Sequence, residues 1–388
     1  MNPILARRYD TAEPVRIEVA AGRIAAVTAA DAPAAATDCW PWVAPGFFDI
    51  QFNGYGGQEF SAPDITPEKV AQITAVLDRF GVTRYCPTLT TNSAAVLDRA
   101  LRAVAAACEA SPAVARRVAG IHLEGPYIST EDGPRGAHPR QHCRGPDWGE
   151  FQRFQEAADG RLRILTMSPE YDGAAGFIAR VVQSGVVVAI GHTAANAAQL
   201  HAAVDAGARL STHLGNGSHL VLPRHANYIW EQLAEDRLAA SLIVDGYHLP
   251  PAVVKSLVRA KTPSRCILIS DMSGLAGRPP GRYAGSLCDV EILPNGRLVV
   301  AGQTELLAGA ALPIGVGVAN VMHFAGVTLA EAVRMATEHP AQLLGLAPGR
   351  LAIGDPAELV LFDLLPPPDG NGPPQFVVRA TIGPDSSP

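Results

Sequence analysis

Acidic and imidazole side chains recur near the ends of apolar runs in this sequence. Glu124 and His213 lie at the ends of two such runs, and His192 follows directly after a third. One carboxylate and two imidazoles form a ligand set suited to a divalent ion such as Zn2+, and Fe2+ or Mn2+ would also accept it. Three protein ligands leave one coordination position open, which is typical of catalytic sites. The sequence therefore predicts one divalent metal ion per chain, with Zn2+ as the first choice.

Two further residues could complete a hydrolytic site. A bound ion would lower the pKa of its water from 15.7 toward ~7, and Asp271 could take the proton and return it to a leaving group. His248 could donate a hydrogen bond to the carbonyl oxygen of a scissile amide. Each residue alone has an ordinary structural role, such as a packed histidine or an aspartate that caps a turn. Their joint position near strand ends favours catalysis.

Two absences narrow the chemistry. Where many two-metal hydrolases carry His-x-His on the first strand, this chain has Gln51-Phe52-Asn53, and the segment 161–170 contains no lysine that could bridge two ions. Neutral amides are poor ligands for transition metals, so Gln51 and Asn53 are expected to orient water near a single ion. The chain also lacks a GxSxG motif and a cysteine in an activating motif, which argues against nucleophilic catalysis.

The elements that would position these residues alternate regularly along the chain. Short apolar, β-branched runs are followed by helix-like stretches, as expected for a parallel sheet with both faces covered. Eight such units predict an α/β fold, a (β/α)8 barrel whose active site lies at the C-terminal ends of the strands. A doubly wound sheet is the competing fold, but no GxGxxG follows the first run. The predicted strands are 46–52, 83–89, 119–125, 161–167, 185–191, 208–214, 240–246 and 265–271.

The two ends of the chain have a different pattern. Residues 1–44 and 348–388 contain short strand-like segments, and we expect them to form a small β-sandwich domain beside a catalytic barrel of residues 45–347. A further hairpin is predicted at 291–300, where Asn295-Gly296 is a strong turn signal. Because this hairpin follows the eighth strand, it is expected to be an insertion in the barrel.

Composition excludes several classes of protein. The 388 residues are 48% hydrophobic and 18% charged, with a net charge of −6 and no Lys/Arg-rich run. This argues against disorder and against nucleic-acid binding. Six scattered cysteines without close pairs predict no disulfides, and together with the lack of a signal-like N-terminus they favour a cytoplasmic protein. The uncharged segment 306–330 is expected to be a buried loop and helix rather than a membrane span.

Six ordered motifs are similar to those of a known family. PGFFDIQFNGYGG, GIHLEGPYIS, GHTAAN, THLGNG, DGYHL and SDMSGLAG occur in sequence between residues 45 and 277. Together they resemble the N-acetylglucosamine-6-phosphate deacetylases of the amidohydrolase superfamily, and the similarity covers almost the whole chain. The resemblance implies a (β/α)8 barrel with a small β-sandwich, a homodimer, and a small-molecule substrate, with acetate and glucosamine 6-phosphate as products.

The resemblance also implies roles for individual residues. Glu124, His192 and His213 would bind the metal, Asp271 would act as general base and acid, and His248 would contact the carbonyl and the sugar. Arg224 lies where the family has a phosphate-binding arginine, although a surface salt bridge is the alternative reading. The other substrate contacts that the resemblance implies are His138, Asn216, Gly217, Leu307 and Gly309.

Departures from the family pattern lie around the substrate pocket. The stretch after His213 is Gly-Asn-Gly-Ser-His instead of an aromatic-Asn-Ala-Met run, the segment 274–285 is longer and more basic, and 307–312 lacks the usual serine hydroxyls. Three alternatives therefore stay open. They are a deacylase of another N-acyl amino sugar or amide, a deaminase of the same superfamily, and a non-catalytic scaffold. Gln51 and Asn53 argue against the deaminase, and the intact ligand set argues against the scaffold.

Overall fold

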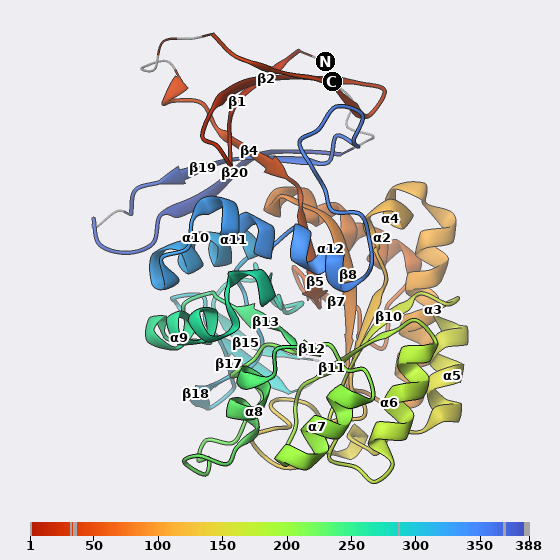
Figure 1. Cartoon of the computed structure of the whole chain (residues 1–388). Helices are drawn as coiled ribbons and strands as arrows, with labels where there is room; N and C mark the ends of the chain where they lie inside the picture. The colour runs from red at the N-terminus through yellow and green to blue at the C-terminus, as the bar shows by residue number, and fades with distance from the viewer. Residues whose placement is uncertain (1, 32, 34–36, 286–287, 368–369, 384–388) are drawn as a thin grey trace.

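Eight parallel strands alternate with helices along the central part of the chain (Figure 1). The computed structural model describes residues 2–31, 33, 37–285, 288–367 and 370–383. All eight predicted strands are confirmed, and they are hydrogen-bonded side by side in chain order. Their bounds are β5 (Phe47–Phe52), β8 (Val82–Thr90), β9 (Ile121–Glu124), β10 (Leu162–Met167), β11 (Val187–Ile190), β12 (Leu210–Ser211), β13 (Ala239–Ile243) and β14 (Cys266–Ile269).

The first and last of these strands close the barrel. β5 and β14 are buried along their whole length, as expected for strands that are covered on both faces. They share no regular ladder, but an isolated parallel bridge joins Phe52 to Met272. The amide of Asp271 also donates to the carbonyl oxygen of Gln51 at 2.9 Å. The predicted (β/α)8 fold is therefore confirmed, and the residues after β14 lie beside the end of β5.

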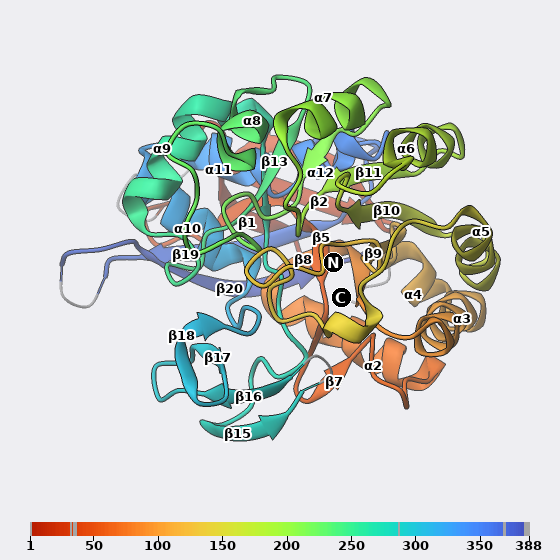
Figure 2. The ribbon, with the colours of Figure 1, turned by 90° about the horizontal axis from the view of Figure 1, so that it is seen from below.

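Helices surround the strands (Figure 2). Several begin at recognisable caps: Thr66 accepts from the amide of Lys69, and Asn196 and Gln199 form a capping box. The helices are α2 (Pro67–Val76), α3 (Ala94–Ala110), α4 (Pro112–Arg117), α5 (Trp148–Ala157), α6 (Ala174–Gln183), α7 (Ala197–Asp205), α8 (Tyr228–Ala234), α9 (Pro251–Lys261), α10 (Ile314–Ala325), α11 (Leu329–Met335) and α12 (Glu338–Leu343).

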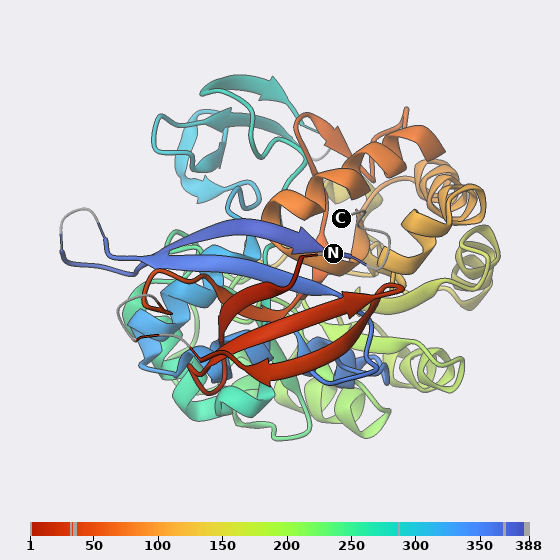
Figure 3. The same cartoon turned by 90° about the horizontal axis from the view of Figure 1, so that it is seen from above.

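Both ends of the chain contribute to one six-stranded sheet that lies across one end of the barrel (Figure 3). Its strands enclose a small core of their own, to which Ile17, Val43 and Leu359 belong. The small β domain predicted from the two chain ends is thus confirmed, while its exact boundaries stay a prediction. The strands are β1 (Ile4–Arg8), β2 (Pro14–Ala20), β3 (Arg23–Ala29), β4 (Trp42–Pro45), β19 (Leu359–Leu365) and β20 (Gln375–Ile382).

A four-stranded antiparallel sheet is inserted after β14. It consists of β15 (Gly281–Ala284), β16 (Asp289–Ile292), β17 (Leu298–Val300) and β18 (Gln303–Leu307). The expected hairpin is therefore formed by β16 and β17, with two further strands that the sequence pattern did not indicate. Beyond this insertion, the uncharged segment 306–330 contains α10, which has 12 residues. Among the described residues, no helix is both long enough and apolar enough to cross a bilayer.

Candidate metal centre and active-site cavity

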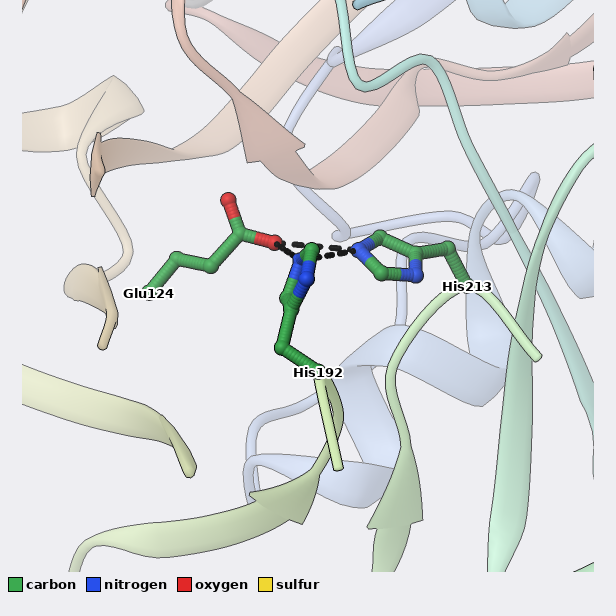
Figure 4. A group of neighbouring side chains, drawn as sticks. All are labelled: Glu124, His192 and His213. Carbon is green, nitrogen blue, oxygen red and sulfur yellow. Dashed lines mark hydrogen bonds and ion pairs between the residues drawn. The ribbon is translucent and has the colours of Figure 1, made fainter. Parts of the chain in front are cut away.

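The three predicted metal ligands converge on one point (Figure 4). Oε1 of Glu124 lies 3.2 Å from Nε2 of His192 and 3.0 Å from Nε2 of His213, and the two Nε2 atoms are 3.1 Å apart. All three side chains are buried. Since Zn–N and Zn–O bonds of ~2.0–2.2 Å bring neighbouring ligands little more than 3 Å apart, these atoms fit a single divalent ion.

Neighbouring groups hold the ligands in the orientation that metal binding requires. Nδ1–H of His192 donates to the carbonyl oxygen of Pro134 at 2.8 Å, which leaves the Nε2 lone pair for a metal. Nε2 of Gln51 donates to Oε1 of Glu124 at 2.9 Å. Burial alone would raise the pKa of Glu124, but the hydrogen bonds with His192 and His213 outweigh it and hold that pKa well below its usual value. The carboxyl group is therefore a carboxylate, as a ligand must be.

The backbone at this site adopts a conformation that side chains other than glycine rarely take. His192, His213 and Asp271 each lie two residues after the end of a barrel strand, with φ values of 51°, 31° and 50°. Such left-handed conformations cost of order 1 kcal/mol or more and cluster at functional sites. The sharp turn at each strand end directs these side chains toward the cavity instead of along the sheet.

Asp271 lines the same cavity as the ligands, and its carboxyl group accepts a hydrogen bond from a neighbouring side chain. Nδ2 of Asn53 donates to its Oδ1 at 2.7 Å. Burial, and secondly the negative charge of Glu124, raise the pKa of Asp271 to about 7. A carboxyl group with this pKa can accept a proton and return it near neutral pH.

His248 is oriented by a buried carboxylate. Its Nδ1–H donates to Oδ2 of Asp245 at 2.8 Å, and its backbone amide donates to Oδ1 of the same residue at 2.9 Å. Burial would raise the pKa of Asp245, but the hydrogen bond from His248 more than offsets it, so the pKa is lowered. The second ring nitrogen of His248 is therefore available to a substrate in the cavity, which this residue lines.

The cavity that contains these residues has a volume of about 1350 Å³. This volume exceeds the usual size of small-molecule sites, so the cavity is large enough for a sugar phosphate. His138 is buried there, with its ring centroid 4.4 Å from that of His192. Burial lowers the pKa of His138 to about 3, so its ring is neutral. The predicted substrate contacts that line the cavity are His138, Asn216, Gly217, His248, Leu307 and Gly309.

Two predicted site residues do not line this cavity. Gln51 is buried and donates a hydrogen bond to Glu124, and the other is Arg224. Arg224 lies exposed on the loop before α8. Two other arginines that the sequence analysis did not single out, Arg135 and Arg297, do line it. Neither belongs to a motif, and the insertion that carries Arg297 is brought to the cavity only by tertiary packing. The spacing Asp245-x-x-His248, close after a strand, is a sequence signal from which the role of Asp245 in orienting His248 could have been predicted.

Comparison with known proteins agrees with this geometry. The model of the amidohydrolase family matches residues 42–382. An N-acetylgalactosamine-6-phosphate deacetylase of Escherichia coli O157:H7 is 34% identical over 323 residues, which cover 82% of this chain and 83% of that protein. This chain belongs to the amidohydrolase family. The N-acetylglucosamine-6-phosphate deacetylase of Bos taurus is similarly related, at 33% identity over 83% of this chain and 79% of its own.

Solved structures of family members show the same architecture. N-acetyl-D-glucosamine-6-phosphate deacetylase of Mycobacterium smegmatis, solved as a mutant in complex with N-acetyl-D-glucosamine-6-phosphate, has a TM-score of 0.85 and 32% identity, covering 99% of this chain and 98% of its own. The corresponding enzyme of Thermotoga maritima has a TM-score of 0.81 and 26% identity, covering 99% of this chain and 98% of its own. The resemblance expected from the six motifs is therefore confirmed.

Proposed function

We propose that this protein is a metal-dependent deacetylase of N-acetylated hexosamine 6-phosphates, with N-acetylglucosamine 6-phosphate as its first expected substrate. The products would be acetate and glucosamine 6-phosphate. The observation that carries the proposal is the convergence of the donor atoms of Glu124, His192 and His213 in the cavity that Asp271 also lines. Relatives that are at least 33% identical over most of the chain carry names of this activity.

Glu124, His192 and His213 would hold one divalent ion, for which Zn2+ is the first choice because two imidazoles and one carboxylate suit it. When bound, such an ion supplies Lewis acidity, which polarises a carbonyl and promotes ionisation of water. Gln51 and Pro134 keep the ligand atoms in place through their hydrogen bonds to Glu124 and His192. The donor set and its supporting bonds therefore fit the cofactor that this chemistry requires.

The chain's own residues would move the protons. A carboxylate oxygen of Asp271 accepts a proton from the attacking water, while the water oxygen bonds to the acetyl carbonyl carbon. His248, held by Asp245, donates a hydrogen bond to the carbonyl oxygen as negative charge develops there. Asp271 then returns the proton to the nitrogen as the carbon–nitrogen bond breaks. Acetic acid and the free amine leave, and the acid's proton passes to the amine to give acetate and an ammonium group, so the reaction consumes one water molecule.

The phosphate would be bound at the mouth of the cavity. Arg135, Arg297 and His219 line it and supply positive or hydrogen-bonding groups. Arg297 has no carboxylate within salt-bridge distance in the described part of the chain. Its guanidinium can therefore donate hydrogen bonds to a phosphate. Arg224 also remains a proposed phosphate contact, from an exposed loop that a second subunit could bring to a cavity.

We further propose a cytoplasmic homodimer. All six cysteines are free thiols, which fits a reducing compartment. Leu220 and Val221, on the same loop as Arg224, are 97% and 86% exposed. Apolar side chains this exposed favour burial against a second copy of the chain. Sedimentation analysis should give twice the monomer mass, and a monomer over the working concentration range would refute this part of the proposal.

The activity is tested by acetate release from three substrates at equal concentration. These are N-acetylglucosamine 6-phosphate, N-acetylgalactosamine 6-phosphate and unphosphorylated N-acetylglucosamine. We expect kcat/KM to be about 100-fold or more higher with a 6-phosphate, since two charged hydrogen bonds contribute roughly 3 kcal/mol. Ammonia release from cytosine-type heterocycles serves as the control for deaminase activity. No acetate from any phosphorylated substrate would contradict the proposal.

The galactosamine epimer is included for a specific reason. The relatives that act on N-acetylgalactosamine 6-phosphate and on N-acetylglucosamine 6-phosphate are 34% and 33% identical to this chain, so identity does not separate the two sugars. The pocket stretch 215–219 also departs from the pattern of the glucosamine enzymes. A kcat/KM that is higher for the galactosamine epimer would assign this second substrate while leaving the hydrolytic chemistry unchanged.

A further inference from the structure

Asp49, on the first barrel strand, contacts the segment after the last barrel strand, which carries Asp271. Asp49 lies in the middle of β5 and is 1% exposed. Its Oδ1 accepts from the backbone amides of Gln51 and Ser270, each at 3.2 Å. Its Oδ2 accepts from the hydroxyl group of Ser270. One carboxyl group thus ties β5 to the residue directly before Asp271.

Ser270 extends this connection past Asp271. Its Oγ accepts from the amide of Met272 at 3.2 Å, so the backbone is held on both sides of Asp271. The carbonyl oxygen of Met272 accepts from the amide of Asn53 at 2.9 Å. Asn53 in turn donates its side-chain amide to Asp271. These contacts form a continuous set between the ends of β5 and β14.

The set of contacts lies where the barrel has no regular backbone ladder. β5 and β14 are the two ends of the hydrogen-bonded strand order, and the Phe52–Met272 bridge is isolated. Side chains therefore supply much of the hydrogen bonding across this closure. A buried carboxyl group is costly compared with an apolar side chain, which makes a purely space-filling role for Asp49 a poor explanation.

We propose that Asp49 is a positioning residue that acts through Ser270 to hold Asp271 in its left-handed conformation and aim its carboxyl group into the cavity. This inference rests on the proposed function only in taking Asp271 as the proton-transferring group. Asp49 itself does not line the cavity. Without the two acceptor oxygens of Asp49, the segment 270–272 can relax from the strained φ of 50° at Asp271.

The test uses Asp49→Asn, Ser270→Ala and the double variant in the metal-loaded full chain. Asparagine keeps the size of Asp49 but replaces one acceptor oxygen with a donor group. We expect kcat for the preferred substrate to fall by about 10- to 100-fold, because misplacement of a catalytic group by ~1 Å can cost 10²-fold. KM and the metal content should stay within about twofold of the wild type, since neither the ligands nor the sugar contacts change. The double variant should lose little more than either single variant, because both break the same contact.

Thr74→Val is the matched control. Thr74 is buried in α2, and its hydroxyl group bonds to Tyr85 and to the carbonyl oxygen of Val70 instead of to the segment 270–272. This variant loses buried hydrogen bonds of a similar kind and should keep its kcat. If Asp49→Asn and Ser270→Ala both keep wild-type kcat, or lose no more than Thr74→Val, the positioning role is refuted. Should Asp49→Asn not fold, Ser270→Ala alone decides the question.

A second readout does not depend on any substrate. Amide hydrogen exchange at Asp271 and Met272 should become faster in Asp49→Asn and in Ser270→Ala, and remain unchanged in Thr74→Val. If the wild type releases no acetate, the proposed function fails, and exchange still decides whether Asp49 holds this segment. Unchanged exchange in both variants would overturn the inference, whatever the substrate proves to be.

Discussion

The proposed proton transfer depends on a single carboxyl group, that of Asp271. Asp271 lies outside the group of three converging ligands, so Asp271→Asn should leave the metal content unchanged. Asparagine cannot accept the proton of water at neutral pH, and turnover should therefore fall by about 10²- to 10⁴-fold. Metal analysis together with acetate release checks this. Loss of the metal in Asp271→Asn would instead identify Asp271 as a ligand.

Asp49 gives a pH dependence of stability. Burial raises the pKa of Asp49 to about 7 from its ordinary value of 3.8, so the folded state binds this proton more tightly than the unfolded chain. The stabilisation is present below pH ~4 and is lost as the pH rises through about 7. Relative to Asp49→Asn, which cannot titrate, the wild type should lose about 4 kcal/mol of unfolding free energy between pH 4 and 8. Urea denaturation at both pH values measures this difference, and a pH-independent difference would contradict the raised pKa.

The site residues differ in how far the sequence could reveal them. Glu124, His192, His213 and Asp271 could be predicted because each lies at or just after the end of an apolar run. Parallel strands bring such positions together at one end of a barrel. The contact of the Pro134 carbonyl oxygen with His192 could not be predicted from the sequence. Every residue has a carbonyl oxygen, and only the folded loop places that of Pro134 beside His192. Asp49 was hidden because its partner Ser270 is 221 residues away in sequence.

Among the elements, the loop between β12 and α8 packs against His192, a predicted metal ligand. Gly217 has φ of 55°, and a Cβ atom there would lie 2.7 Å from Nδ1 of His192. Gly217→Ala should displace His192 from its contact with Pro134 and lower the metal affinity by about 10- to 100-fold. Gly345→Ala is the control, because its φ of 65° is equally unfavourable but no atom lies within 4 Å of the added group. Competition with a chelator measures both variants, and equal affinities would show that the contact with His192 is unimportant.

The elements themselves were largely predictable from periodicity. One of the helix-like stretches of the sequence forms α3, which begins after the cap residue Ser93 and whose buried apolar residues follow the helical period. Of the four-stranded insertion, only the hairpin of β16 and β17 was predicted. This hairpin has the Asn295-Gly296 turn signal, whereas β18 is mostly exposed and lacks the apolar alternation by which a strand is identified.

At the scale of the whole molecule, the end domain and the barrel share aromatic contacts. Phe362 of β19 is fully buried and stacks on Phe376 of β20 at 4.4 Å, and Phe376 lies 5.6 Å from Phe47 at the start of β5. Phe362→Ala should lower the free energy of unfolding by about 3–5 kcal/mol, as is usual for a large buried side chain. Because this contact is remote from the cavity, kcat/KM of the folded variant should not change. A loss of activity without a loss of stability in urea would show that the end domain acts on the site.

The central claim is that one divalent ion, held by Glu124, His192 and His213, makes this chain a hydrolase. Titration of metal-free protein with Zn2+, followed by acetate release from the preferred amino-sugar 6-phosphate, tests it most directly. Activity should rise linearly and reach its plateau at one ion per chain, and Glu124→Gln should not regain activity at the same ion concentration. Full activity of the metal-free protein, or a plateau at two ions per chain, would contradict the account.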